Sequence, residues 1–208
     1  MYYLLSAIIG YLLGSIPTGY LMLKRQGINI ITSGSGNIGA MNTFEITNSK
    51  VTGLLVFFID AIKGLLSVYI PLLLFPFGFG CAAIALLFAV LSHCYNPWIK
   101  FKGGRGLATS LGGTLLIAPF IPALWLCTWI LVYLIKKDIL LGNILATFLA
   151  IIIILALPET VFKYSFPKAE SISSLMFFST ALLTIIFIKH IDPIMELLTK
   201  YNIINKKG

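Results

Sequence analysis

Residues 52–75 read TGLLVFFIDAIKGLLSVYIPLLLF, an apolar run whose only charged side chains are Asp60 and Lys63. A helix needs about 20 mostly apolar residues to cross the hydrocarbon core of a bilayer. This run meets that length, and several other runs in the chain do so as well. The sequence therefore predicts an all-α fold, a polytopic integral membrane helical bundle.

The composition supports the same class. The chain has 208 residues, of which 59% are hydrophobic and 11% are charged, whereas a soluble domain carries about 25% charged residues. No linker, repeat or low-complexity segment divides it, so we expect one membrane-embedded domain over residues 1–208. The apolar runs predict spans near residues 3–23, 52–75, 80–99, 107–119, 121–135, 143–158 and 172–189.

The number of spans depends on residues 107–135. At about 1.5 Å per residue this segment is longer than one bilayer crossing. Pro119 to Pro122 predicts a tight outer turn between two helices, which gives seven transmembrane helices. The alternative is one long helix kinked at the prolines, which gives six. We favour seven.

The cations predict the orientation. No positive charge precedes the first apolar run, so we expect an uncleaved first helix with its N-terminus outside. The C-terminus is then cytoplasmic, and only Lys163 and Lys168 fall in outer loops. Cytoplasmic loops are enriched in Lys and Arg. The inner loops and tail hold Lys24, Arg25, Lys50, Lys100, Lys102, Arg105, Lys136, Lys137, Lys189, Lys200, Lys206 and Lys207. The net charge of +8 is thus explained mainly by the membrane topology. It also favours anionic lipid or substrate at the inner surface. No nucleic-acid partner is expected.

The first inner loop, residues 32–42, reads TSGSGNIGAMN and contains the pattern G-x-G-x-x-G. A dinucleotide fingerprint requires a preceding strand, whereas here a membrane helix precedes the glycines, so we reject that interpretation. Glycines still allow backbone N–H groups to approach an anion, and polar side chains add hydrogen bonds. The alternative is a flexible polar turn. The candidate anion ligands are Ser35, Gly36, Asn37, Gly39 and Asn42.

The third inner loop, residues 98–109, reads WIKFKGGRGLAT and gives a stronger signal. Its three glycines, Gly103, Gly104 and Gly106, interleave with two cations and lead directly into a helix. A glycine-rich turn before a helix presents free amides and the positive end of the helix dipole. A basic loop that serves only topology is the alternative, but such a loop needs no glycines. The pattern therefore indicates an anion site, although the Walker A spacing is missing.

Ionisable residues within or at the ends of the spans are further candidates. Asp60 and Lys63 lie three residues apart, on one helix face, and ionisable groups inside a membrane usually face the bundle interior. They form either a structural ion pair or a support for the anion site. Gly64 allows close helix approach. His93 and His190, the only histidines, both fall near inner ends of spans.

Other catalytic chemistries are not supported by the sequence. Neither histidine begins the H-x-x-x-x-D dyad of one class of glycerolipid acyltransferases, because Trp98 and Met195 occupy the Asp positions. No G-x-S-x-G elbow or zinc spacing occurs. The cysteines, which we expect to be packing residues, are Cys81, Cys94 and Cys127.

Taken together, the motifs resemble those of the bacterial acyl-phosphate:glycerol-3-phosphate acyltransferase family. The matching segments run through the chain in order, as Gly14-Ser-Ile-Pro17 with Gly19-Tyr20, Gly34-Ser-Gly-Asn-Ile-Gly-Ala40 with Asn42, Asp60 with Lys63-Gly64, His93, Phe101-Lys-Gly-Gly-Arg-Gly-Leu-Ala-Thr109, and His190.

The resemblance implies a seven-helix enzyme of phospholipid synthesis in the bacterial cytoplasmic membrane, with its active site on the cytoplasmic face. It would transfer a fatty acyl group from acyl phosphate to glycerol 3-phosphate, giving 1-acylglycerol 3-phosphate and phosphate. No metal or other cofactor is implied, because acyl phosphate is already activated. We expect catalytic roles for His190, Lys102, Arg105 and His93. Substrate contacts are expected from the first-loop residues above and from Lys63, Gly103, Gly104, Gly106, Thr109 and Asn143.

The sequence departs from the family at several positions. An Arg that is thought to hold substrate phosphate is Glu45 here, which replaces attraction with repulsion. A neighbouring Thr is Met41, and a Lys of the glycine loop is Arg105, which keeps the charge but not the reach. Asn143 stands at the position of a Ser, and Pro193 stands where Asn normally follows the last His.

Three functions therefore stay open from the sequence. The first is an active acyltransferase of this family, and the second is a divergent paralogue with a lost or altered substrate. The third is a small transporter, which is disfavoured because the polar motifs gather at one face rather than at the midplane. The sequence leaves the acyl-chain preference and the oligomeric state open.

Overall fold

The computed structural model describes residues 1–200, apart from the side chains of residues 196, 199 and 200, and all regular secondary structure in that part of the chain is helical. The expected cations Lys206 and Lys207 lie outside the described residues. In chain order the elements are α1 (Tyr2–Gly14), α2 (Thr18–Lys24), η1 (Ile30–Thr32), α3 (Ala40–Thr47), α4 (Lys50–Leu74), α5 (Gly78–Cys94), η2 (Pro97–Ile99), α6 (Leu107–Ile117), α7 (Phe120–Lys136), α8 (Ile139–Ala156), α9 (Pro158–Lys163), α10 (Ile172–Ile188) and α11 (Ile191–Lys200).

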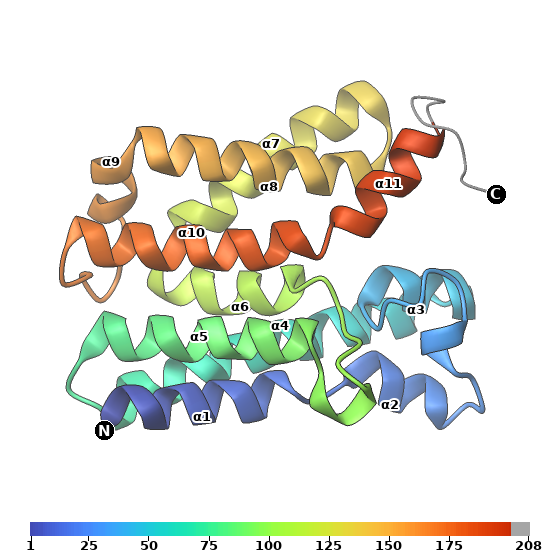
Figure 1. Cartoon of the computed structure of the whole chain (residues 1–208), viewed down its shortest axis with the longest axis horizontal. Helices are drawn as coiled ribbons and strands as arrows, with labels where there is room; N and C mark the ends of the chain where they lie inside the picture. Colours follow the sequence, from blue (N-terminus) through green and yellow to red (C-terminus); the bar gives the residue numbers. More distant parts are fainter. Residues whose placement is uncertain (201–208) are drawn as a thin grey trace.

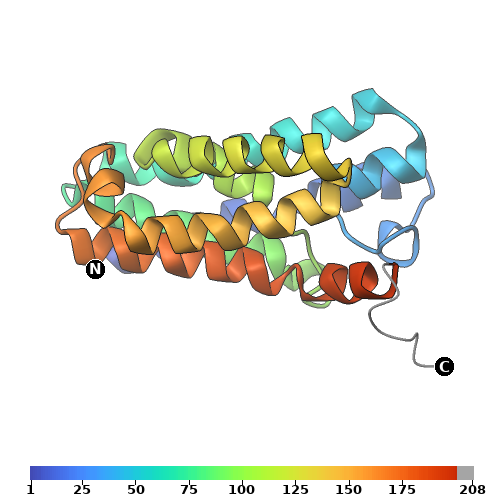
Figure 2. The ribbon, with the colours of Figure 1, turned by 90° about the horizontal axis from the view of Figure 1, so that it is seen from above.

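The helices form two layers (Figure 1). One layer holds α1, α4, α5 and α6, in which α1 packs on α5 and α4 packs on α6. The other holds α7, α8 and α10, and α10 contacts α5 across the layers. The short helices α2, α3 and α11 gather at one end of the bundle, and the N-terminus lies at the opposite end (Figures 1 and 2). The end with α2, α3 and α11 carries both glycine-rich loops.

Four helices are long and apolar enough to cross a membrane, namely Tyr2–Lys24 taken as one unit, Lys50–Leu74, Gly78–Ile99 and Ile139–Ala156. Three shorter apolar helices, α6, α7 and α10, occupy the other expected spans. Each predicted span thus coincides with a helix. Helix α6 has 11 residues, which at about 1.5 Å each gives about 16 Å, short of the roughly 30 Å of a hydrocarbon core.

Residues 107–135 form two helices rather than one kinked helix. Helix α6 ends at Ile117 and α7 begins at Phe120. The turn is shorter than predicted, because Pro122 already lies in the first turn of α7. A proline is tolerated there since the first amides of a helix have no intrahelical partner.

The predicted first span, residues 3–23, coincides with a candidate span but consists of two helices rather than one. The chain breaks between Gly14 and Thr18, because Pro17 lacks an N–H and clashes with the preceding turn. The break frees backbone carbonyls, and buried side chains from α4 and the α5–α6 segment bind them. Lys63 Nζ donates to Ile16 O at 2.9 Å, and Asn96 Nδ2 donates to Ser15 O at 2.6 Å.

Helices α4 and α6 pack with their backbones in close contact. A methyl group at Gly64 would overlap the backbone oxygen of Thr109, and one at Gly112 would overlap the backbone oxygen of Ala61. The predicted role of Gly64 in close helix approach is confirmed. Such small-residue contacts are typical of membrane helix pairs, and this one sets the position of the α6 N-terminus relative to α4.

The cysteines agree in part with their expected packing role. Cys81 and Cys94 are buried and unpaired, and Cys94 belongs to the main apolar core between the two layers. Cys127 is exposed on α7, so it does not pack in that core.

Candidate active site

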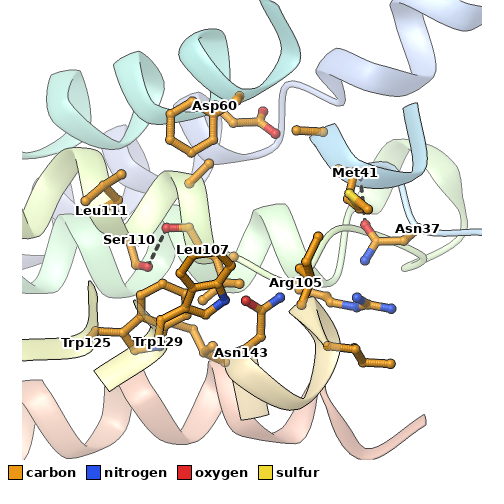
Figure 3. A pocket seen from close by; sticks show the side chains of 18 of the residues that line it. Asn37, Met41, Asp60, Arg105, Leu107, Ser110, Leu111, Trp125, Trp129 and Asn143 are labelled. Atoms are coloured by element: carbon orange, nitrogen blue, oxygen red, sulfur yellow. Dashed lines mark hydrogen bonds between the residues drawn. The ribbon is translucent and has the colours of Figure 1, made fainter. Parts of the chain in front are cut away.

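A cavity of about 750 Å³ lies between the two layers. In Figure 3, Leu111, Trp125 and Trp129 lie toward one end of it, and Asn37 and Arg105 lie toward the other. The apolar wall also includes Ile121, Leu183 and Ile186, and the polar wall includes Ser35, Gly39, Asn42, Glu45, Gly106 and Asn143. The cavity therefore joins a polar compartment at one end to an apolar compartment at the other.

Asn42 organises the first glycine loop. This side chain, only 3% exposed, accepts a hydrogen bond from Ser35 N at 2.9 Å and donates to Asn37 O at 2.7 Å. The Asn37 side chain in turn accepts from Gly39 N at 2.8 Å. Gly36 adopts a φ of 71°, which favours glycine, but it does not line the cavity. The two asparagines were expected to bind an anion. Here the Asn42 side-chain amide and the Asn37 side-chain oxygen instead hydrogen-bond to the backbone of the loop.

Replacing Asn42 with alanine is expected to release the loop without unfolding the bundle. The change removes three hydrogen bonds that close residues 33–37 onto α3, at a cost of about 1 kcal/mol each. We expect faster amide hydrogen exchange confined to residues 33–40, together with a raised KM. Exchange that stays slow in the Asn42→Ala protein would contradict the bracing role.

The second glycine loop reaches the cavity only at its C-terminal end. Arg105 and Gly106 line the cavity, whereas Lys102 is exposed outside it. Gly103 and Gly104 pack against the last turn of α5, since a methyl group on either would overlap atoms of that turn. These two glycines are thus explained by close packing, not by exposure of their amides to an anion as expected. Of the other expected ligands, Thr109 is buried against α4, and neither it nor Lys63 lines the cavity.

Two helix N-termini open onto the polar compartment. Helix α6 follows Gly106, which has a φ of 83°, and helix α3 follows Gly39. Neither has a side-chain cap hydrogen bond, and residues of both first turns line the cavity. Uncapped N-terminal amides and the helix dipole favour a bound anion. With Arg105 beside them, they form a site suited to phosphate.

His190 lies at the junction of α10 and α11, close to this site but not on the cavity wall. It is fully buried, and its Nδ1 donates to Ile186 O at 2.8 Å. Nε2 then carries the lone pair, and no described residue hydrogen-bonds to it. Burial lowers the pKa of His190 from 6.5 to about 4; the Ile186 hydrogen bond opposes this and the Arg105 charge adds to it. The ring is therefore neutral at pH 7, with an acceptor nitrogen free for a proton.

A buried polar network lies beside the cavity. Lys63 Nζ is 2.8 Å from Asp60 Oδ1 and 2.9 Å from His93 Nδ1, which confirms the predicted ion pair. Asp60 and His93 line the cavity, and Asp60, Lys63 and His93 are all buried. The network joins α4 and α5, and through Thr18 Oγ1, which donates to Asp60 at 2.9 Å, it reaches α2.

Several cavity residues were not singled out from the sequence as candidates. Lys137 and Asp138, at the α7–α8 junction, line the polar part, and Trp125 and Trp129 line the apolar part. The tryptophans are four residues apart and so share a helix face, a signal that was present in the sequence. Nothing in the sequence indicated the two junction residues. Glu45, noted as a departure, does line the cavity.

The fold and the site together define a class of protein, a helical bundle with membrane-length apolar helices and a cavity that joins a polar compartment to an apolar one. Comparison with known sequences then identifies the family. The chain belongs to the glycerol-3-phosphate acyltransferase family, whose profile matches residues 4–200.

Named relatives cover most of the chain. The glycerol-3-phosphate acyltransferase of Aquifex aeolicus is 32% identical over 200 residues, which are 94% of this chain and 95% of the relative. The Helicobacter pylori enzyme is 33% identical over 158 residues, 73% of this chain and 71% of the relative.

Solved structures agree with the family. The crystal structure of PlsY (YgiH), described as an integral membrane glycerol 3-phosphate acyltransferase, in its glycerol 3-phosphate form, superposes with a TM-score of 0.79 at 30% identity. The match covers 96% of this chain and 94% of that chain. The lysophosphatidic acid form gives a TM-score of 0.77 at 29% identity. The likeness supports an integral membrane fold for this chain.

Proposed function

We propose that this chain transfers a fatty acyl group from acyl phosphate to glycerol 3-phosphate, giving 1-acylglycerol 3-phosphate and phosphate. The observation that carries the proposal is the shared cavity, in which the α3 and α6 N-termini and Arg105 adjoin an apolar compartment. Both reactants carry phosphate and one carries a hydrocarbon chain. The names of the relatives and of the solved structures support acyl transfer to glycerol 3-phosphate.

The reaction needs no covalent enzyme intermediate. The glycerol 3-phosphate hydroxyl oxygen bonds to the acyl carbonyl carbon, the bond from that carbon to the phosphate oxygen breaks, and the hydroxyl proton leaves. Arg105 and the first amides of α6 would stabilise the charge of the leaving phosphate. His190 Nε2, a neutral acceptor near Arg105, would take the proton. Holding the two reactants in one cavity supplies much of the acceleration.

The roles of the remaining predicted residues belong to this proposal. Ser35, Gly39 and Asn143 line the cavity and would contact substrate. Gly36, Asn37, Asn42, Gly103 and Gly104 would shape the two loops. Lys102 stays a predicted catalytic residue, although its exposed side chain does not line the cavity.

The finer topology is also a proposal. Seven transmembrane helices, an outer N-terminus and a cytoplasmic C-terminus would place both glycine loops at the inner face of the bacterial cytoplasmic membrane. The inner loops carry most of the cations, as the positive-inside rule requires. Glycerol 3-phosphate would enter from the cytosol and acyl phosphate from the inner leaflet.

A second candidate is a family member with an altered acceptor. Glu45 and Asp138 give the polar compartment negative charge, and Lys137 brings a cation from another element. A phosphorylated acceptor that also carries a positive charge or additional hydroxyls would fit this mixture. We therefore include such acceptors in the assay below.

The test is acyl transfer by the purified full-length protein in lipid nanodiscs. With acyl phosphate as donor, we expect phosphate release and 1-acylglycerol 3-phosphate formation that depend on glycerol 3-phosphate. Release that is independent of glycerol 3-phosphate, with no acylglycerol product, would contradict the proposed function. Dependence on a different phosphorylated acceptor would favour the second candidate.

A further inference from the structure

Two large aromatic side chains, Trp98 and Phe101, are exposed on the segment between α5 and α6. Trp98 is 71% exposed and Phe101 is 65% exposed, whereas Ile99 between them is buried. In Figure 1 this segment reaches the outer edge of its layer, where α1 ends and α2 begins. The two rings therefore lie on the outside of the bundle, directly before the second glycine loop.

The backbone fixes the two rings in their outward positions. Asn96 is fully buried, and it accepts hydrogen bonds from Trp98 N on its side-chain oxygen at 3.1 Å and from Phe101 N on its backbone oxygen at 2.8 Å. Ile99 packs with Leu23 in a small apolar core beneath the segment. Phe101 has a φ of 57°, a left-handed conformation that is unfavourable for a residue with a Cβ atom. The exposure of the rings is thus part of a braced turn.

Trp98 extends a lipid-facing surface. Leu5, Ile8 and Leu12 are exposed on α1, and their spacing of three and four residues places them on one helix face. In a membrane-embedded bundle, such an exposed apolar face contacts lipid. Trp98 Nε1 donates to Ser15 Oγ at 3.1 Å, and Ser15 lies three residues beyond Leu12. The indole ring is therefore held at the end of this apolar face.

The position of Trp98 along the bundle matches the edge of the hydrocarbon core. Helix α5 has 17 residues, which at 1.5 Å per residue gives about 26 Å, close to the roughly 30 Å of the core. Trp98 follows the end of α5 by four residues. Exposed cations, among them Lys24 and Arg25, lie at the same end of the bundle, as expected beside anionic headgroups.

We propose that Trp98 and Phe101 insert between the lipid headgroups and the acyl chains of the leaflet at the α2 and α3 end of the bundle, and that this insertion sets the depth of the second glycine loop. Amphipathic aromatic rings prefer this region of a bilayer. Arg105 follows Phe101 by four residues on the same segment, so insertion also sets the depth of Arg105. The consequence for acyl transfer rests on the proposed function.

Depth-dependent fluorescence quenching tests the insertion. Full-length protein is placed in nanodiscs whose lipids carry bromine either near the headgroup or near the end of the acyl chain. Trp125 and Trp129 are the other two tryptophans, so subtracting the emission of Trp98→Phe from that of wild type isolates Trp98. We expect bromine near the headgroup to remove most of the Trp98 emission, and bromine near the chain end to remove less.

Two results would overturn the proposal. In the first, acrylamide in the water quenches Trp98 and neither brominated lipid does, which would place the ring in water and favour a soluble partner for this surface. In the second, bromine near the chain end quenches Trp98 more strongly, which would place the segment deep in the hydrocarbon core.

Kinetics test the link between insertion and the glycine loop. Trp98→Ser with Phe101→Ser makes the surface polar, whereas Trp98→Leu with Phe101→Leu keeps it apolar. We expect the serine double variant to raise KM for acyl phosphate several-fold and to leave KM for glycerol 3-phosphate close to wild type, because only acyl phosphate enters from the leaflet. The leucine double variant should recover most of the loss. Equal losses in the two double variants would refute the link.

Phe166→Ser is the matched control. Phe166 is 73% exposed and lies between α9 and α10, at the opposite end of the bundle from the glycine loops (Figure 1). The same change from an exposed aromatic ring to a hydroxyl should leave both KM values close to wild type. An increase in KM for acyl phosphate as large as that of the serine double variant would show a general effect of lost apolar surface and would contradict the proposal.

The two proposals fail in different ways. If the wild-type protein transfers no acyl group but bromine near the headgroup quenches Trp98, the proposed reaction is wrong and the insertion stands. If the wild type is active and Trp98 is quenched only from the water, the insertion is wrong and the reaction stands.

Discussion

Replacing Arg105 with alanine is expected to lower kcat/KM for acyl transfer by about a thousandfold, because a preorganised donor to developing charge contributes about 10²–10³ in rate and this donor is also a full charge. Arg105 lines the polar compartment beside the α6 N-terminus. The fold should persist, since the side chain is half-buried at the edge of the cavity. Steady-state kinetics in nanodiscs measure the effect.

Lys100→Ala is the matched control for this prediction. Lys100 precedes the same loop, is exposed and does not line the cavity, so its removal should change kcat/KM by no more than about twofold. Arg105→Lys keeps the charge but loses the bidentate geometry and should recover only part of the activity. Equal losses at positions 100 and 105 would show that general basic charge, rather than the cavity site, matters.

The Lys102→Ala variant tests whether the sequence pattern or the structure describes the role of Lys102 correctly. The sequence pattern predicts a catalytic role, whereas the structure leaves its side chain outside the cavity. A loss at Lys102→Ala comparable to that at Arg105→Ala would mean that the loop rearranges when substrate binds.

Gly64→Ala is expected to destabilise the bundle and to reduce activity at the same time. The added methyl group overlaps the backbone oxygen of Thr109, and a backbone atom cannot rotate away. Overpacking costs about 1–3 kcal/mol, which lowers the apparent unfolding midpoint by roughly 2 to 12 °C at about 2–4 °C per kcal/mol. Because α6 must move, its N-terminus moves away from the anion site. Thermal unfolding in detergent and activity are measured on one preparation.

Leu65→Ala is the control at the neighbouring position. Leu65 is 39% exposed on α4 and adds no backbone contact with α6, so its truncation should change the midpoint and the activity less than Gly64→Ala does. The reciprocal variant Gly112→Ala meets the backbone oxygen of Ala61 and should reproduce the effect of Gly64→Ala. A Gly64→Ala protein with wild-type stability would contradict the close contact.

The helices could be predicted because an apolar run of bilayer length is stable mainly as a membrane-spanning helix. The break at Pro17 was missed because hydropathy averages over the residues that surround it. What makes the break stable is distant in sequence, since Lys63 and Asn96 bind the freed carbonyls of Ile16 and Ser15. A local pattern does not contain such partners.

The location of the site could be predicted from the sequence, but the roles of its individual residues could be predicted less well. Glycine patterns correctly indicated two special loops, and Arg105, Gly39 and Ser35 do line one cavity. The pattern did not distinguish a glycine that opens an amide to an anion from one that allows close packing, as at Gly104. That difference depends on what the neighbouring helix places against the loop. From α8 the sequence indicated only Asn143, and the place of Lys137 and Asp138 at the α7–α8 junction could not be predicted for the same reason.

The central claim is that phosphate binds where Arg105 and the α6 N-terminus meet the cavity. A crystal structure of the protein with glycerol 3-phosphate tests it most directly. We expect phosphate oxygens within about 3.2 Å of the Arg105 guanidinium and of the first amide nitrogens of α6. Glycerol 3-phosphate bound elsewhere, with Arg105 and these amides contacting only protein or water, would contradict the account.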